Sequence, residues 1–580
     1  MIGNGEIAAV LAELARLTTL EEGSSQSFRV RAYEKAARAV EAATESLADW
    51  TERRLTTLDG VGPGTARKIR ELVETGTIDT LEALRDRYPP AFVDITRIPG
   101  VGPKTAVLLR ERLGIESVED LRRALDAERL RDVPGLGAKT EGNIRRSLER
   151  LGGLGGKDRR TPIIEAMRTA RDAVAAIGEV PGVERAEAMG SLRRFRETIG
   201  DVDIIATSTG DPGAVMERFV SMPVVRDVVA FGGRKSAVVS SSGLQIDLRV
   251  VEPEQFGAAA VYFTGSKAHN IALRQRAIER GWTLNEYALA DAESGAVVAS
   301  ETEEDVYEAL GLTWIPPTIR EDTGEIELAA RGELPDLVTG ADLRGDLHVH
   351  TDASGDGRAP MQAMLRACED RGYEYVAITD HGEDLAINGL SRERMVAQRA
   401  ELEAFADRFE LAVLHGVELN IAPDGDLDYD PSFRSGFGFG VASVHSHFDL
   451  DRDAETKRIV RAMEDPSVNV IGHLTGRRIG RRPGIDLDVE AVLDAAARTG
   501  CAIEINSHLD RLDAPVEFLR MARDRDDVLF ALSTDAHDVA ELDNARWGVL
   551  QAQRGWIPRD RIVTTWPARR FMAWVRETRA

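Results

Sequence analysis

In its first half the chain reads Gly190-Ser-Leu-Arg-Arg-Phe-Arg-Glu-Thr-Ile-Gly-Asp-Val-Asp203, and this stretch decides the fold of that region. It ends in Asp-Val-Asp, and in a strand Asp201 and Asp203 project from one face while the residue between them packs on the other. Two close carboxylates repel each other unless cations lie between them, and Mg²⁺ prefers such oxygen ligands. A third carboxylate, Asp247, alternates with apolar residues in Gln245-Ile-Asp-Leu-Arg249. The pattern predicts strands that carry three carboxylates for two-metal phosphoryl transfer.

The flanking residues distinguish this motif from an ordinary acidic strand edge, which is what a bare Asp-x-Asp indicates. Gly190-Ser191 and Arg193-Arg194 precede it and supply donors for phosphate oxygens. Downstream the chain reads Tyr262-Phe-Thr-Gly-Ser-Lys-Ala-His-Asn270. The whole set resembles the palm and thumb of the family X nucleotidyltransferases.

That resemblance implies the roles of individual residues. The three aspartates would bind two Mg²⁺ or Mn²⁺ ions, and the Tyr-Phe pair would lie beside the sugar of a deoxynucleoside triphosphate. Phe195 stands where many relatives have glycine, which puts the shape of the loop near the triphosphate in doubt. The residues implied in nucleotide binding are Gly190, Ser191, Arg194, Gly200, Tyr262, Phe263, Gly265 and Asn270.

Bulk composition predicts a multidomain globular protein. A chain of 580 residues is too long for one hydrophobic core, and 43% hydrophobic with 30% charged residues is typical of globular proteins. It contains no run of about eighteen apolar residues, and its N-terminus lacks a secretory pattern. Cys368 and Cys501 each lie in an apolar stretch, which predicts buried, reduced thiols. We expect a cytoplasmic monomer with no membrane partner.

The net charge of −24 argues against nucleic-acid binding, but its distribution weakens that argument. Residues 1–150 carry 24 basic and 25 acidic side chains, so nearly all the excess negative charge lies beyond them. A protein with several carboxylate-rich metal sites can be acidic overall and still bind phosphates locally.

A short element repeats three times in residues 1–150, which we predict to be helical. The copies span residues 58–69, 98–109 and 133–144, and each reads apolar-x-Gly-apolar-Gly before a helix start. The glycines permit a tight turn, and the helix then offers unpaired N–H groups to a DNA phosphate. No strand precedes them, which excludes a dinucleotide-binding loop. The copies resemble helix–hairpin–helix motifs, and the implied DNA-binding residues are Gly60, Gly62, Gly100, Gly102, Gly135, Gly137 and Lys35.

Residues 1–85 resemble the small N-terminal domain of DNA polymerase beta and its bacterial relatives, with Val30-Arg-Ala-Tyr-Glu-Lys-Ala-Ala-Arg38 upstream of the first hairpin. In that family the lysine at the place of Lys68 forms a Schiff base with a 5′-deoxyribose phosphate. We expect like charge on Arg67, Arg70 and Lys35 to lower its pKa, as amine catalysis requires. The alternative, a solvated lysine that only touches the 5′-phosphate, stays open.

Residues 345–537 hold most of the histidines, and several follow short apolar strands. Asp346-Leu-His-Val-His350 places His348 and His350 on one strand face. In a β/α barrel the ends of successive strands meet at one mouth, where active sites gather. Imidazole and carboxylate groups without thiolates suit Mn²⁺, Zn²⁺ or Fe²⁺, and nine such groups imply two or three ions.

The pattern resembles the PHP phosphoesterase domain found fused to bacterial family X polymerases. The family's Ser-Asp-Gly appears here as Ser354-Gly-Asp-Gly357, which is one residue longer. Asp356 matches the family's aspartate better than Asp352 does, but the loop must then bulge. His447 is an alternative to His445, and Arg511 is either a phosphate-binding residue or a surface arginine. The implied metal ligands are His348, His350, Asp356, His381, Glu418, His445, His473, Asp535 and His537.

The predicted fold is multidomain, α+β and α/β: a helical helix–hairpin–helix domain, a nucleotidyltransferase palm with fingers and thumb, and a C-terminal distorted β/α barrel. Gly152-Gly-Leu-Gly-Gly156 is predicted to be a flexible linker. The expected domains are an N-terminal DNA-end-binding domain (1–85), fingers (86–155), palm (156–260), thumb (261–320), a linker (321–341) and the PHP domain (342–580).

The function that these motifs predict is a DNA polymerase that fills short gaps in DNA repair. It would act on gapped or primer-template DNA with deoxynucleoside triphosphates, and the PHP domain would supply a metal-dependent 3′→5′ exonuclease, with AP-endonuclease activity left open. Two rival hypotheses are an end-bridging protein with a silent polymerase and a phosphoesterase for small phosphate esters. Intact aspartates count against the first, and three hairpins count against the second.

Overall fold

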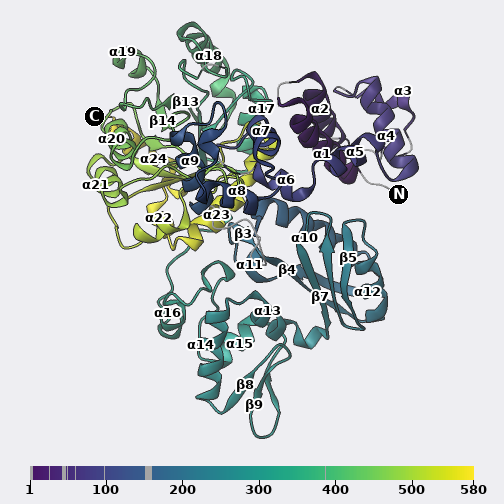
Figure 1. Ribbon diagram of the computed structural model, residues 1–580. Coiled ribbons are helices and arrows are strands. Elements are labelled where there is room, and N and C mark those ends of the chain that lie inside the picture. The colour runs from purple at the N-terminus through teal and green to yellow at the C-terminus, as the bar shows by residue number, and fades with distance from the viewer. Residues whose placement is uncertain are drawn as a thin grey trace. The chain divides into compact units, whose positions relative to one another are not determined.

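The computed structural model divides into two compact units, each described here by itself (Figure 1). One comprises residues 1–159 with 480–483, and the other comprises 160–479 and 484–580. The predicted linker at Gly152–Gly156 lies outside the described residues. None of the helices in the described part is long and apolar enough to cross a membrane. The structure describes residues 4–579 apart from 25–26, 42, 44–46, 49, 59, 97, 99, 151–159 and 386.

The first unit is helical, which confirms the prediction for residues 1–150. One buried apolar cluster runs through it, from Ile7 near its start to Leu148 near its end. Its elements are α1 (Asn4–Glu22), α2 (Phe28–Glu41), α3 (Glu52–Leu55), α4 (Pro63–Thr75), α5 (Asp79–Arg87), α6 (Pro90–Ile95), α7 (Pro103–Leu113), α8 (Val118–Asp126), η1 (Leu130–Asp132) and α9 (Ala138–Arg150).

The three glycine pairs adopt one repeated conformation. The first glycine of each pair is left-handed, with φ of 92° at Gly60, 92° at Gly100 and 87° at Gly135. An L side chain is strained there, which explains why glycine recurs. Gly62 and Gly102 are the N-caps of α4 and α7, and no described atom lies within 4 Å of where their Cβ atoms would be. The free helix N-termini therefore face open space, as backbone binding of phosphate requires.

In the second unit, a five-stranded sheet of order β2-β4-β7-β6-β5 positions the predicted aspartates. Only β4 and β7 run parallel; the other pairs are antiparallel. Helices α10 (Ile163–Gly178) and α12 (Pro212–Val220) pack on one face, to which Val202 and Ile204 contribute. Ile205 packs with α13 (Phe256–Thr264) on the other face. The strands are β2 (Val183–Ala188), β4 (Asp201–Ser208), β5 (Val225–Phe231), β6 (Lys235–Ser240) and β7 (Gln245–Val251); the short β1 (Thr161–Pro162) and β3 (Thr198–Ile199) pair beside them.

Residues after α13 form a smaller lobe around a buried cluster that includes Leu273, Tyr307 and Leu310. A three-stranded antiparallel sheet of order β10-β9-β8 belongs to it. The elements are α14 (Lys267–Ile278), β8 (Trp282–Leu284), β9 (Leu289–Asp291), β10 (Val297–Ala299) and α15 (Glu303–Ala309).

The segment 321–341, which was expected to be a linker, contains a helix, α16 (Glu325–Arg331). Ile326 and Ala329 are buried against the preceding lobe. Glu325 is fully buried, and one of its carboxylate oxygens lies 2.7 Å from Nδ1 of His269. A buried hydrogen bond between His269 and Glu325, together with apolar neighbours, fixes this segment, although its composition is polar.

The C-terminal part is the predicted barrel: seven parallel strands in sequential order, β11 to β17. The amide of His350 donates to the carbonyl of Ala536 over 2.8 Å, which brings the first and last strands together. Cys368 and Cys501 are buried and free, as expected. The strands are β11 (Gly345–Val349), β12 (Tyr375–Ile378), β13 (Ala412–Asn420), β14 (Phe439–Ser443), β15 (Val470–Ile471), β16 (Ala502–Asn506) and β17 (Phe530–Ser533). The helices are α17 (Met361–Asp370), α18 (Arg392–Phe405), α19 (Pro431–Arg434), α20 (Arg452–Met463), α21 (Val489–Thr499), α22 (Val516–Met521), α23 (Ala545–Arg554) and α24 (Ala568–Thr578).

Replacing Gly257 in α13 by alanine is expected to lower the free energy of unfolding by about 1–3 kcal/mol, as overpacking does. The new Cβ would lie 2.2 Å from the carbonyl carbon of Thr302. Thermal denaturation checks this, with Gly178→Ala at the end of α10 as the control, because no described atom lies within 4 Å of that Cβ position. A Gly257→Ala protein as stable as the unsubstituted chain would contradict the close approach.

Candidate active sites

The three predicted aspartates converge on one face of the first sheet. Asp201 and Asp203 lie two residues apart on β4, and Asp203 is directly opposite Asp247 on the parallel strand β7. Burial raises the pKa of Asp203 to about 7, and the charges of Asp201 and Asp247 act in the same direction. Bound divalent cations would relieve this repulsion, so the residues present fit a two-metal site.

Because residue 190 is glycine, the backbone at this position can lie close to the carboxylate of Asp203. Gly190 has a φ of 66°, and a Cβ there would lie 2.7 Å from Oδ2 of Asp203. The amide of the preceding Met189 donates to the carbonyl of Asp203 over 2.7 Å. The glycine motif and the aspartate strand are therefore held in contact, with α11 (Gly190–Arg193) beginning beside the carboxylates.

A cleft of about 780 Å³ opens over Asp201 and Asp203, whereas Asp247 is not part of its lining. Asp201 and Asp203 line it, while Gly200 is exposed outside its lining. The structure thus brings together most residues of the predicted nucleotide set. Those that line the cleft are Gly190, Ser191, Arg194, Tyr262, Phe263, Gly265 and Asn270.

The aromatic pair and the asparagine form one wall of the cleft. The rings of Tyr262 and Phe263 lie edge to face with centroids 5.0 Å apart. Asn270 donates from Nδ2 to the carbonyl of Tyr262 over 2.6 Å, and its buried Oδ1 has no hydrogen-bond partner among the described atoms.

Sequence reasoning missed the other charged residues of the cleft. Arg160, Arg196, Lys267 and Arg274 also line it, so its basic character is greater than the motif indicated. Arg160 donates from Nε to Thr198 on β3 over 2.9 Å, and only this strand pairing brings it near the aspartates. The dibasic Arg159-Arg160 was the available signal in the sequence.

Glu321 is an acidic residue in the same cleft that the sequence did not indicate. Its Oε1 lies 3.2 Å from Nε of Arg194, whose NH1 also donates to the carbonyl of Thr264. The predicted phosphate-binding arginine is therefore held in place by one carboxylate and one carbonyl.

The predicted metal ligands of the barrel lie at or just beyond the carboxyl ends of its strands, the common pattern of β/α barrels. His348 is inside β11 and His350 follows it; His381, His445, His473 and Asp535 follow later strands. Glu418 departs from the prediction that it follows a strand, because β13 continues to Asn420 and places Glu418 within it.

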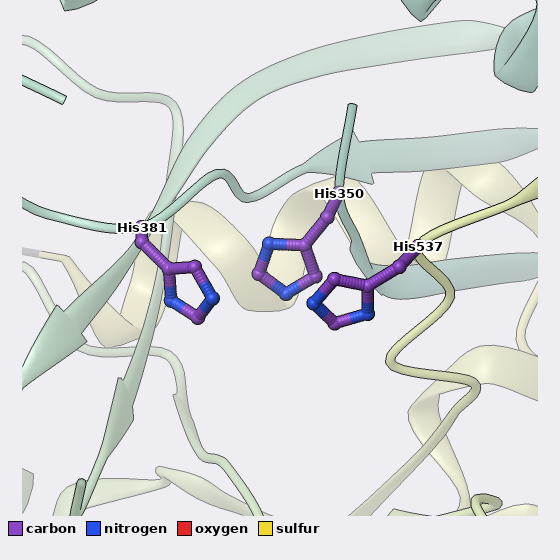
Figure 2. Close-up of side chains that lie close together, drawn as sticks. All are labelled: His350, His381 and His537. Atoms are coloured by element: carbon purple, nitrogen blue, oxygen red, sulfur yellow. The ribbon is translucent and has the colours of Figure 1, made fainter. Parts of the chain in front are cut away.

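The ligand atoms form three overlapping groups. Figure 2 shows the rings of His350, His381 and His537 lying close together. The ring centroids of His350 and His537 are 4.2 Å apart. In each group the ligand atoms lie within 4.8 Å of one another. The groups are His350, His381 and His537; His348, His350 and Asp535; and His381, Glu418 and His445.

Glu418 links the groups, because it is fully buried and surrounded by histidines. Its carboxylate oxygens lie 2.7 Å from Nδ1 of His381, 3.2 Å from Nε2 of His445 and 3.1 Å from Nε2 of His473. Although burial opposes it, the charges of His445 and of other nearby histidines hold the pKa of Glu418 well below its ordinary value. This side chain is therefore ionised and able to bridge cations.

The structure favours Asp356 and His445 over the alternatives. Asp356 lies 3.3 Å from His381 and 3.5 Å from His537, and Asn388 donates to it over 2.6 Å, whereas Asp352 is exposed. The longer loop thus does deliver Asp356. His447 is exposed, and its Nδ1 lies 3.0 Å from the hydroxyl of Ser446, outside the cluster.

The cluster has the properties of a cation site. The described atoms supply no hydrogen-bond partner for Nε2 of His348 or for either ring nitrogen of His350, although both side chains are fully buried. Burial lowers the pKa of His350 to about 3, and the charges of His537 and His381 lower it further. The neutral, unpartnered imidazole of His350 beside ionised carboxylates fits divalent metal ions.

One supporting residue of this cluster, Glu504, escaped prediction, and the position of a second, Arg511, was left open. Glu504 in β16 accepts from Nδ1 of His348 at 2.7 Å and from the amide of His473 at 2.5 Å, so it fixes two ligands. A charged residue in the apolar strand Ala502–Asn506 was the signal. Arg511 is 8% exposed and lies 3.5 Å from Asp535, so the surface alternative for this arginine is wrong.

In the first unit, Lys68 lies on α4 and donates from Nζ to Thr80 over 2.8 Å. Burial is the main cause that lowers its pKa, with smaller contributions from Arg29 and Arg67. The expected cause, like charge on Arg67, Arg70 and Lys35, was therefore only partly right. Arg67 does contribute, whereas the guanidinium of Arg70 lies 2.6 Å from the carboxylate of Glu74. Lys35 lies against the first hairpin, where a Cβ on Gly60 would be 2.7 Å from its Cγ.

Comparison with known families finds four matches along the chain. Residues 2–78 match a helix-hairpin-helix domain, and residues 92–150 match a SAM-like helix-hairpin-helix tandem. Residues 259–321 match the DNA polymerase beta thumb, and residues 346–508 match the PHP domain.

Curated proteins give two kinds of relative. The chain is 36% identical over 541 residues to the DNA polymerase/3′-5′ exonuclease PolX of Bacillus subtilis (strain 168), covering 93% of each chain. It is 27% identical over 215 residues to a probable phosphatase of Vibrio atlanticus (strain LGP32), covering 35% of this chain and 82% of that protein. A probable phosphatase of Vibrio campbellii (strain ATCC BAA-1116) is 25% identical over 244 residues, covering 40% of this chain and 93% of that protein.

Replacing Gly357 by alanine is expected to displace the loop that carries Asp356, because the new Cβ would lie 1.8 Å from the carbonyl oxygen of Thr351. We expect fewer metal ions per chain, measured by elemental analysis after dialysis, without a change in the separate aspartate site. Gly340→Ala, where no described atom lies within 4 Å of the Cβ position, is the control. Full metal content in Gly357→Ala would show that the loop is not constrained in this way.

Proposed function

The chain belongs to the family X DNA polymerases that carry a C-terminal PHP domain, and we propose that it fills short gaps in damaged DNA and trims 3′ ends with a second active site. The observation that carries this is that one chain holds two separate clusters of side chains that fit metal ions. One set lies beside a basic cleft that fits a triphosphate, and the other lies at the mouth of a barrel.

In the polymerase site, Ser191, Arg194 and Arg160 bind the triphosphate of the incoming nucleotide. Tyr262 and Phe263 lie beside its sugar, and Asn270, which lines the same cleft, contacts its base. Asp201, Asp203 and Asp247 hold two Mg²⁺ or Mn²⁺ ions. These residues orient the nucleotide on the primer end and keep its phosphates within a basic cleft.

In the PHP site, nine side chains hold two or three Mn²⁺, Zn²⁺ or Fe²⁺ ions. Glu504 keeps His348 and the backbone at His473 in place for that purpose. Arg511, next to Asp535, binds a phosphate of the DNA strand. At both sites, bound cations would withdraw charge from the phosphate oxygens and so assist phosphoryl transfer or phosphodiester hydrolysis.

The helical unit binds the ends of the gap through its three hairpins. Their open helix N-termini contact phosphates without reading sequence, so binding weakens as salt rises. Lys68, whose pKa burial lowers, acts there as the amine that removes a 5′-deoxyribose phosphate. The protein works as a monomer in the cytoplasm, and cleavage at abasic sites is a further activity of the PHP site.

The central test uses a labelled primer on a one-nucleotide-gapped duplex with a 5′-phosphate, in Mn²⁺, with and without deoxynucleotides. We expect extension by one nucleotide when they are present and shortening when they are absent. Asp203→Asn should lower extension about a hundredfold or more, since metal ions contribute several kcal/mol to phosphoryl transfer, and should spare shortening. His348→Ala should do the reverse.

These variants serve as controls for each other, because each removes one site and leaves the other. A primer unchanged in both lanes despite tight binding would favour an end-bridging protein. Release of phosphate from small esters without digestion of DNA would favour a small-molecule phosphoesterase.

The lyase role of Lys68 is tested by borohydride reduction in the presence of DNA with a 5′-deoxyribose phosphate. A Schiff base would be trapped as a covalent protein–DNA product on a denaturing gel, and Lys68→Ala should lose that product. Lys104→Ala, at the start of α7 in the second hairpin, is the matched control and should retain it. Equal trapping by Lys68→Ala would assign the chemistry to another amine.

A further inference from the structure

The loop after α11 faces the nucleotide cleft on one side and the barrel on the other. Ser191, Arg194 and Arg196 line the cleft, whereas Phe195 is 1% exposed and belongs to the buried core of the palm. That core also includes Leu512 of the barrel, which is fully buried. The palm and the barrel therefore share one apolar interior directly behind the nucleotide cleft.

We infer that three barrel side chains, Trp547, Arg554 and Arg477, are positioning residues of the polymerase site. They fix the loop that presents Ser191 and Arg194 to the triphosphate. The inference rests on the proposed function, since it takes nucleotide binding by this loop as given.

The backbone of Phe195 is the first observation. Its φ is 57°, a left-handed conformation that is strained for a bulky residue and persists only where the surroundings enforce it. The ring of Trp547 stacks on its ring, with centroids 5.8 Å apart and planes at 13°. Arg554, itself 3% exposed, donates from NH1 to the carbonyl of Phe195 over 3.0 Å. The barrel thus holds both the ring and the carbonyl of the strained residue.

A second anchor lies two residues further along the loop. Arg477 forms a two-pronged pair with Glu197, at 2.8 Å and 3.0 Å. Its Nε also donates to the carbonyl of Arg511 over 2.7 Å, and NH2 donates to the carbonyl of Leu512. An arginine bound to two carbonyls of its own barrel has little freedom, so it fixes Glu197 firmly.

Short hydrogen bonds connect these anchors to the phosphate-binding residues. The amide of Phe195 donates to the carbonyl of Leu192, and the amide of Arg196 donates to the carbonyl of Ser191, both over 2.9 Å. Moving Phe195 must therefore move Ser191 and Arg194 as well. Contacts to the triphosphate that are equally strong in the ground state and the transition state lower KM without changing kcat, so loss of this support is expected to raise KM.

The test measures kcat and KM for the nucleotide on gapped duplex, the rate of 3′ shortening, and the melting temperature. Trp547→Ala and Arg554→Met should each raise KM about tenfold, with kcat within about threefold and 3′ shortening unchanged, as lost ground-state positioning predicts. Trp547→Phe, which keeps a ring on Phe195, should restore KM to near that of the unsubstituted chain.

Arg561→Met is the matched control. Arg561 is also a buried arginine of the barrel, and it donates to the carbonyls of Val528, Arg523 and Ala522, all within the barrel. We expect this variant to melt at a lower temperature with an unchanged KM for the nucleotide.

A double-mutant cycle tests whether Trp547 acts through Phe195. Glycine adopts the left-handed backbone without strain, so in Phe195→Gly the ring contact is gone while the loop can keep its shape. Adding Trp547→Ala to that protein should then raise KM no further. Fully additive effects would overturn the inference.

The two proposals fail in different ways. If the unsubstituted chain inserts no nucleotide, the proposed function fails. If it does insert one, and KM is unchanged in Trp547→Ala and Arg554→Met, the positioning role is wrong. Parallel losses of extension, 3′ shortening and melting temperature in these variants would also overturn it. If Arg554→Met does not fold, the comparison of Trp547→Ala with Trp547→Phe decides.

Discussion

Parallel strand pairing is the constraint on which both candidate sites depend. In the palm, only β4 and β7 run parallel, and their register places Asp203 opposite Asp247, 44 positions later in the chain. In the barrel, seven parallel strands direct their carboxyl ends to one mouth, and the bond from His350 to Ala536 joins the first strand to the last. Main-chain hydrogen bonds thus bring the acidic and imidazole groups together before any side-chain contact is considered.

The electrostatic consequence differs between the two sites. The polymerase carboxylates lie beside an open cleft, and repulsion together with burial raises the pKa of Asp203 to about 7. In the barrel the cluster is buried, and burial and neighbouring charges shift the pKa values of its side chains. The pKa of Glu418 is lowered, so its carboxylate is ionised, and the pKa of His350 is lowered, so its imidazole is neutral. Burying charged groups is costly, so bound cations would stabilise both arrangements. The supporting pairs, Arg194 with Glu321 and His348 with Glu504, limit that cost by fixing orientation.

The sequence predicted the architecture because the motifs obey local rules. Glycine pairs before helices, aspartates two apart in a strand and histidines after apolar strands each follow from backbone geometry, and the fold class is confirmed. The site roles stay predictions, although the structure brings most of those residues together. What was missed depends on tertiary pairing: Arg160 reaches the cleft through β3, and α16 is fixed by the contact of Glu325 with His269. Such contacts join residues dozens of positions apart and leave no periodic signal.

The apolar interior shared by palm and barrel has a consequence for how this protein can change over evolutionary time. Replacing a single histidine of the barrel cluster, such as His350, would leave the apolar clusters of the barrel intact. Deleting the barrel, in contrast, would leave Phe195 and the palm residues around Leu512 exposed to water. A lineage that no longer needs the nuclease is therefore expected to retain an inert barrel as a scaffold rather than to shorten the gene.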